Sequence, residues 1–320
     1  PGEIYDMMRQ YLWVIFWGIL ATFLYNYFAC LLRAVGNSVA PLIFLAVSSV
    51  MNIVMDLWFV LGFHWGVAGA AFATVLSQYV SGIGLAVYTY WKTPEFRIQP
   101  RYLKPKPAML KEIGQFSFLT SVQQSVMNLG ILMVQGLVNS FGTVIMAAFA
   151  AAVKIDSFAY MPAQEFGNAF STFVAQNYGA GKSERIRKGI KTAVVLSVGF
   201  CLVISLLVFI FAGPLMTIFV DPAETEILEA GVEYLRIEGA FYCGIGCLFL
   251  LYGLYRAIKR PGMSVVLTIF SLGTRVVLAY VLSGIDFIGV TGIWWSVPIG
   301  WALADLVGFL YYKKNKKKLF

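Results

Sequence analysis

The chain has 320 residues, of which 59% are hydrophobic and only 12% charged. A soluble domain is nearer half apolar and a quarter charged, so the composition excludes an ordinary soluble protein. Its repeated apolar runs of about twenty residues predict membrane-spanning helices. The four cysteines all lie inside such runs, and their spacing favours neither a metal site nor a disulfide framework.

The apolar runs predict an all-α polytopic membrane protein with nine transmembrane helices. In chain order the predicted spans cover about 11–32, 41–61, 66–90, 114–139, 144–177, 191–217, 233–255, 263–282 and 289–312. Pro162 and Pro298 lie inside the fifth and ninth spans, where proline removes a helical hydrogen bond and we expect kinks.

Basic residues are confined to alternate connections. Twenty of the 24 Lys and Arg follow spans one, three, five and seven or lie in the C-terminal tail, and the opposite connections carry none. The positive-inside rule therefore places the basic connections and the C-terminus in the cytoplasm. The net charge of +8 is then an orientation signal, and we expect no nucleic-acid partner.

An internal repeat appears when the chain is shifted by 223 residues. Glu3-Ile4 falls on Glu226-Ile227, Leu31-x-Arg33-Ala34 on Leu254-x-Arg256-Ala257, and Gly66-Val67-x-Gly69 on Gly289-Val290-x-Gly292. Spans one to three thus repeat as spans seven to nine in the same orientation, which is a transporter architecture. Spans four to six have no partner, so we expect three further helices upstream of Pro1 in a twelve-helix protein.

Four short motifs resemble those of the multidrug and toxic compound extrusion (MATE) transporters. They are R-A-x-G-[DN] at 33–37, N-I-x-x-D at 52–56, G-x-x-G-A-A at 66–71 and Q-N-x-G-A at 176–180. The resemblance implies two lobes around a central cavity, with this chain supplying helices four to twelve of twelve. Residues 1–91 would be the second half of the N-terminal lobe, 92–113 a cytoplasmic linker, and 114–320 the C-terminal lobe.

The same resemblance implies a function. We expect secondary active export of cationic, amphiphilic organic compounds by Na⁺ or H⁺ antiport through alternating access, without a cofactor. The expected partners are small organic cations and the lipid bilayer, and the expected form is a monomer in the cell membrane. A lipid-linked oligosaccharide flippase of the same superfamily stays open, because such proteins carry more cationic charge in the cavity. The single histidine, His64, lies in an outer turn and gives no catalytic constellation, so we expect no enzyme.

Charged side chains near the membrane midplane are costly and usually face a cavity or a partner. Lys154 and Asp156 lie ~15–18 Å into the fifth span at 1.5 Å per residue, so we predict that they border the cavity. Tyr160 shares a helix face with Asp156 at i+4. The other candidates for substrate or ion binding are Glu165 in the same span, the amides Gln124 and Asn128 in span four, and Asn52, Asp56 and Arg275, for which packing is the alternative. Arg275 is the repeat equivalent of Asn52. We assign no catalytic, cofactor-binding or metal-binding residue.

Overall fold

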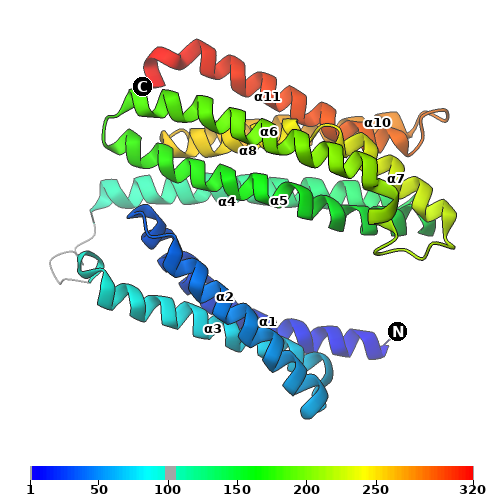
Figure 1. The fold of residues 1–320 in the computed structure, drawn as a ribbon, viewed down its shortest axis with the longest axis horizontal. Helices are drawn as coiled ribbons and strands as arrows, with labels where there is room; N and C mark the ends of the chain where they lie inside the picture. Colours follow the sequence, from blue (N-terminus) through cyan, green and yellow to red (C-terminus); the bar gives the residue numbers. More distant parts are fainter. Residues whose placement is uncertain (1, 98–105, 320) are drawn as a thin grey trace. The chain divides into compact units, whose positions relative to one another are not determined.

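The computed structural model describes residues 2–97 and 106–319, and within these ranges every regular element is helical (Figure 1). The predicted all-α class is therefore confirmed. The chain divides into two compact units, Pro1–Pro105 and Lys106–Phe320. The helices are α1 (Gly2–Ala34), α2 (Val39–Leu57), α3 (Gly66–Lys92), α4 (Pro107–Asn139), α5 (Thr143–Gly179), α6 (Ser183–Met216), α7 (Thr225–Gly239), α8 (Tyr242–Ala257), α9 (Pro261–Thr268), α10 (Thr274–Ser283) and α11 (Thr291–Leu319).

The predicted count of nine membrane spans is approximate, because not every predicted span is both long and apolar enough in the structure. Across the described residues, seven helical segments are long and apolar enough to cross a membrane, and α7 with α8 makes an eighth if this bent pair counts as one span. The predicted span that does not qualify is 114–139, which is helical as part of α4. Its polar amides, Gln123, Gln124 and Asn128, reduce the hydropathy of that segment.

The breaks in the described helices lie away from Pro162 and Pro298, and the kinks expected at these prolines stay predictions. Helices α5 and α11 continue through Pro162 and Pro298. Non-helical dihedral angles appear instead at Phe211, three residues before Pro214 in α6. The sharpest break separates α7 from α8, whose axes differ by 52°. No proline lies at that break, which follows Gly239.

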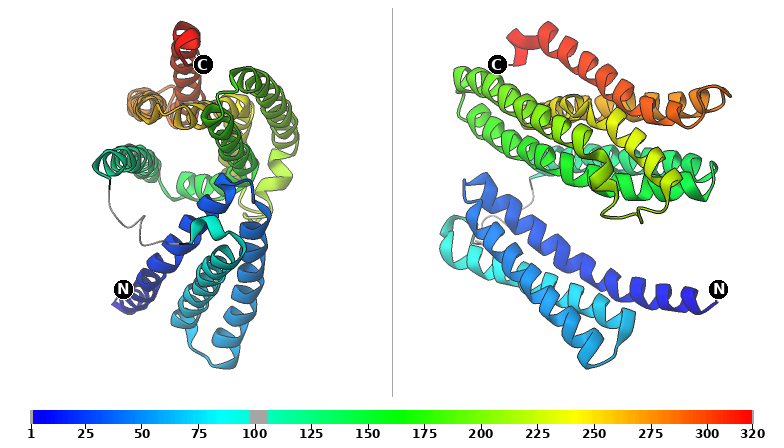
Figure 2. Two further views of the ribbon diagram at one scale, coloured as in Figure 1. Left: turned by 90° about the vertical axis from the view of Figure 1, so that its left-hand side faces the viewer. Right: turned by 45° about the vertical axis from the view of Figure 1, so that its right-hand side comes forward.

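The smaller unit is a bundle of three helices in which α1 and α3 lie side by side (Figure 2). Its core is small and consists of Ala29 and Leu32 from α1, Ala40 from α2 and Leu85 from α3. Gly82 permits the close approach, because a Cβ there would lie 2.8 Å from the Ala21 carbonyl oxygen. Most other large side chains of α1 and α2 are exposed apolar residues, as lipid-facing helices require.

The larger unit has a continuous apolar core. Helix α8 packs against α5, α6 and α11, and these helices run alongside one another in Figures 1 and 2. Glycines bring α5 and α8 close together, since a Cβ at Gly253 would lie 2.6 Å from the Gly167 carbonyl oxygen. This close crossing places the middle of α5 against the bent α7–α8 segment.

The internal repeat is visible in the helix ends. Helix α1 spans Gly2–Ala34 and the α7–α8 pair spans Thr225–Ala257, which is the same stretch shifted by 223 residues. Two residues after the last helical residue, each has a residue in the left-handed conformation, Gly36 with φ +88° and Lys259 with φ +59°. The next residue of each donates its N–H back to the helix, at 2.9 Å for Asn37 and 2.8 Å for Arg260.

Candidate functional site

A buried carboxylate lies in the middle of α5. Asp156 is only 4% exposed, and its Oδ1 atom is buried without a hydrogen-bond partner among the described residues. Small neighbours such as Ala152 let the adjacent helices approach closely at this point. A buried ionised carboxylate without compensation costs several kcal/mol, so such a group is retained where it binds something or pairs with a charge.

A second carboxylate, Glu238, is buried beside it on α7. Glu238 is 2% exposed, and its Oε2 atom likewise makes no hydrogen bond to a described residue. It interacts electrostatically with Asp156, so the two acids belong to one cluster. Tyr234 and Tyr242 lie four residues before and after Glu238, and both tyrosines are 1% exposed. The break between α7 and α8 falls directly between Glu238 and Tyr242.

Arg275 of α10 supplies the positive charge of this cluster. It interacts electrostatically with Asp156 and Glu238, and its Nε atom is buried without a hydrogen-bond partner in the described part of the chain. It forms no ion pair within 4.0 Å with either acid. The one such pair among the described residues joins Lys259 to Glu112. We call Asp156, Glu238 and Arg275 the charged cluster. With all three ionised its formal charge is −1.

Aromatic rings close the outer side of the charged cluster. Phe149 of α5 stacks on Trp294 of α11 with ring centroids 5.6 Å apart, and the ring of Tyr234 stands edge-on to both, at 5.5 Å and 5.0 Å. The indole Nε1 of Trp294 is buried without a hydrogen-bond partner among described residues. These rings exclude water, and in a dry environment charge interactions are stronger.

Lys154 and Tyr160, predicted near Asp156, have different surroundings. Lys154 is exposed, and its Nζ atom lies 5.5 Å from the ring centroid of Phe219. The structure therefore does not bring Lys154 into contact with Asp156, as expected for two residues at i and i+2 on one helix. Tyr160 is half-buried, interacts electrostatically with Tyr242, and its ring lies 6.3 Å from that of Phe249.

The remaining candidates lie outside the charged cluster. Glu165 is exposed and accepts a hydrogen bond from Asn168 at 3.4 Å, and Gln124 and Asn128 are exposed on α4. In the smaller unit, Asn52 donates to the Thr74 hydroxyl at 3.4 Å. One turn further along α2, Asp56 has a buried Oδ1 without a hydrogen-bond partner among the described residues.

Sequence reasoning did not select Glu238, although a signal was present. Tyr234, Glu238 and Tyr242 are spaced i, i+4, i+8, which places them on one helix face. Glu238 lies within the predicted span 233–255 and is separated from the acidic outer connection by a full helical turn. A charged residue at that position carries the same functional expectation as Asp156.

Comparisons with known proteins agree with this architecture. The sequence profile of the family described as MatE matches residues 1–58 and 117–281. The chain is 30% identical to a Bacillus subtilis protein named "Probable multidrug resistance protein YpnP", over 99% of this chain and 70% of that protein. It is 28% identical to a Thermotoga maritima protein named "Probable multidrug resistance protein NorM", over 100% of this chain and 67% of that protein.

A solved structure has the same fold. It is titled as the outward-facing conformation of a multidrug resistance MATE family transporter of the MOP superfamily. It superposes with a TM-score of 0.92 at 23% identity, over 100% of this chain and 71% of that one.

Proposed function

Because the chain belongs to the MatE family of multi-pass membrane transporters, we propose that it exports cationic, amphiphilic organic compounds from the cell by antiport against Na⁺ or H⁺. The family consists of transporters, so the chain is not an enzyme. Two relatives of known name are multidrug resistance proteins, which supports small organic molecules as the substrate class. The basic connections support a cytoplasmic C-terminus and outward export.

The observation that carries the proposal is the charged cluster. Antiport by alternating access requires that ion and substrate favour different states of the carrier. Asp156 and Glu238 are both almost fully buried, and Arg275 compensates only one of the two negative charges. Binding of one Na⁺ or H⁺ neutralises the remaining charge and stabilises the closed, dry arrangement. Release of that ion favours a rearrangement that rehydrates the acids.

The two acids lie in different structural settings, and we assign them different roles. Asp156 lies on the continuous helix α5, whereas Glu238 lies beside the break between α7 and α8. A change in the angle at this break alters the surroundings of Glu238 and Tyr242 relative to α5. Ion binding to the charged cluster is thereby coupled to the angle between α7 and α8. Alternating access requires such a coupling between ion binding and conformation.

The experiment is export of a fluorescent organic cation from cells or vesicles carrying the protein. We expect Asp156→Asn and Glu238→Gln each to reduce export at least tenfold at normal expression, since loss of a coupling energy of about 1.4 kcal/mol or more corresponds to that factor. The matched control is Glu229→Gln, which removes an exposed carboxylate from the same helix as Glu238 and should retain export. Dissipating the Na⁺ gradient and the pH gradient separately identifies the coupling ion. Full export by both cluster variants would refute the assignment.

The alternative function, flipping of a lipid-linked oligosaccharide, fits the charges less well. Such a substrate is anionic and calls for a positive binding region. Arg275 is outnumbered by two acids in the charged cluster, and Lys154 lies apart from it against Phe219. Transport of an anionic glycolipid by vesicles that do not export organic cations would favour this alternative.

A further inference from the structure

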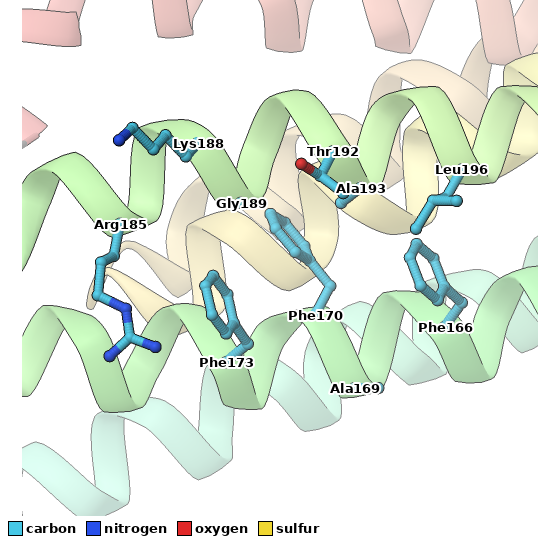
Figure 3. Close-up of a pocket in the computed structure, with 10 residues that line it drawn as sticks. All are labelled: Phe166, Ala169, Phe170, Phe173, Arg185, Lys188, Gly189, Thr192, Ala193 and Leu196. Carbon is cyan, nitrogen blue, oxygen red and sulfur yellow. The ribbon is translucent and has the colours of Figure 1, made fainter.

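A groove runs between α5 and α6, away from the charged cluster. Its volume is about 530 Å³, within the range of ~300–1,000 Å³ typical of ligand sites. Figure 3 shows three phenylalanine rings in a row along α5, pointing toward α6. The lining residues are Phe166, Ala169, Phe170, Phe173, Arg185, Lys188, Gly189, Thr192, Ala193 and Leu196. Most of the groove is thus apolar, and both charged residues come from the first turns of α6.

A glycine shapes the charged end of the groove. A Cβ at Gly189 would collide with the Phe173 ring, so only glycine lets this ring rest against the α6 backbone. Further along, Ala169 and Ala193 leave space beside Phe166 and Phe170 that larger side chains would fill. The groove therefore results from small residues placed opposite a row of rings.

The two basic side chains at this end share the first turns of α6 with one acid, Glu184. Arg185 reaches from α6 toward α5 beyond Phe173, and Lys188 extends along α6 toward the same end (Figure 3). Both side chains are exposed, and neither forms an ion pair with a described residue. Cations near a helix N-terminus interact unfavourably with the helix dipole, and α6 begins at Ser183. An anion bound here would relieve both effects.

We propose that this groove binds an anionic glycerophospholipid. One acyl chain lies along Phe166, Phe170 and Phe173, and the headgroup phosphate contacts Arg185 with Lys188 nearby. Helices α5 and α6 both qualify as membrane spans, so a lipid is the ligand that reaches the apolar part of the groove. Basic pockets between transmembrane helices at a membrane surface suit anionic headgroups. The proposal is independent of ion coupling by the charged cluster.

The test counts lipids retained by the purified protein in neutral detergent, measured by native mass spectrometry. Phosphatidylglycerol and phosphatidylcholine with identical acyl chains are each added to the neutral detergent in small amounts. The micelle surface then stays uncharged, and general attraction to it does not contribute to lipid binding. We expect the protein to retain phosphatidylglycerol in preference. Arg185→Gln with Lys188→Gln should weaken its retention about 30-fold, because each of the two basic residues contributes about 1 kcal/mol at a lipid surface and about 1.4 kcal/mol corresponds to a factor of ten.

A matched control is available on the same helix. Arg187→Gln with Lys191→Gln removes two exposed basic residues that do not line the groove, and should change retention less than twofold. Ala169→Phe tests the apolar part at an exposed position, where the larger side chain fills the groove without entering the core. It should reduce retention of long-chain phosphatidylglycerol and leave a six-carbon-chain analogue unaffected.

Three outcomes would overturn the proposal. Equal loss in the two double variants would mean that general charge attraction retains the lipid. Equal retention of phosphatidylcholine would remove the role of the basic end. Protection of the protein against thermal unfolding by inorganic phosphate alone, to the same extent as by phosphatidylglycerol, would mean that the site takes a free anion. Circular dichroism of each variant confirms that the helices are intact.

Discussion

The two halves of the internal repeat have the same backbone landmarks and different chemistry. Helix α1 is continuous, whereas its equivalent is divided into α7 and α8 with a bend of 52°. Glu238 beside that bend corresponds to Ile15 in α1, and Arg275 corresponds to Asn52. The turns are nevertheless preserved, with φ +56° at Gly66 and +54° at Gly289.

This comparison separates what the scaffold needs from what the site needs. Left-handed positions recur because the chain must reverse at the same points in both halves. The charges of Glu238 and Arg275 do not recur, although charges near the helix ends, such as Arg33 and Arg256, do. In the first half, Asn52 forms a neutral hydrogen bond with Thr74, and in the second, Arg275 compensates buried acids. The two halves of the repeat therefore share their backbone turns and differ in their polar side chains.

The largest predicted difference between the halves concerns Arg275 and Asn52. Arg275→Gln should destabilise the protein by about 3 kcal/mol, because it leaves two buried acids without compensation. Asn52→Ala should cost only about 1 kcal/mol, the value of one neutral hydrogen bond. Chemical unfolding in detergent micelles measures both.

A second substitution tests the physical reason. Adding Glu238→Gln to Arg275→Gln should restore part of the lost stability, because one buried negative charge is then removed. If Arg275→Gln is as mild as Asn52→Ala, or if the double variant is no more stable than the single one, Arg275 does not compensate the acids.

The next effect concerns the left-handed residue after each helix. Gly36→Ala should destabilise by about 1 kcal/mol, because a side chain at positive φ meets the backbone. At the equivalent position Lys259 already bears that cost, so Lys259→Gly should be about 1 kcal/mol more stable than Lys259→Ala. Comparing these two lysine variants cancels the loss of the side chain itself. Equal unfolding midpoints for the two would contradict the repeat assignment of these turns.

The smallest effect is a pH dependence present in the second half only. Lys259 lies in the turn after α8 and contacts Glu112 at 2.6 Å. Hydrogen bonding to Glu112 raises the pKa of Lys259 above its ordinary value of 10.5. The resulting stability is present below the unfolded pKa and is lost as pH rises through the folded pKa.

Unfolding midpoints at pH 8 and pH 11 test this dependence. Glu112→Gln should lower the midpoint slightly at pH 8 and by a smaller amount at pH 11, because the pKa of Lys259 is raised above 10.5 and the ion pair is only partly lost there. The exposed Glu229 provides a control, since Glu229→Gln should have no pH-dependent effect of this kind. A difference between wild type and Glu112→Gln that is equally large at pH 8 and pH 11 would have another origin than this ion pair.

Much of the fold could be predicted from sequence because its signals are local. Apolar runs and turn residues located the long helical segments, and three landmarks with one offset revealed the repeat that Gly36 and Lys259 display. The bend between α7 and α8 was not predictable in this way. It lies in a segment without proline, next to Gly239, where a Cβ would lie 3.0 Å from Val208 of α6. Such a bend depends on contacts between distant segments.

The candidate site was predictable only in part, for a related reason. Depth along a span selected Asp156, and the structure buries it. Depth alone also selected Lys154, which the helix directs to an exposed face. Glu238 required recognition of a helix face in addition to an apolar run. That these residues bind ion or substrate stays a prediction for Asp156, Lys154 and the others alike.

The close crossing of α5 and α8 has a mechanical consequence. With Gly167 and Gly253 face to face, the two backbones are in direct contact, and no flexible side chain lies between them to absorb movement. We therefore expect the two helices to move together as one rigid body at this point. We then expect large motions of the larger unit to occur away from this crossing, for example at the break between α7 and α8 that precedes Tyr242.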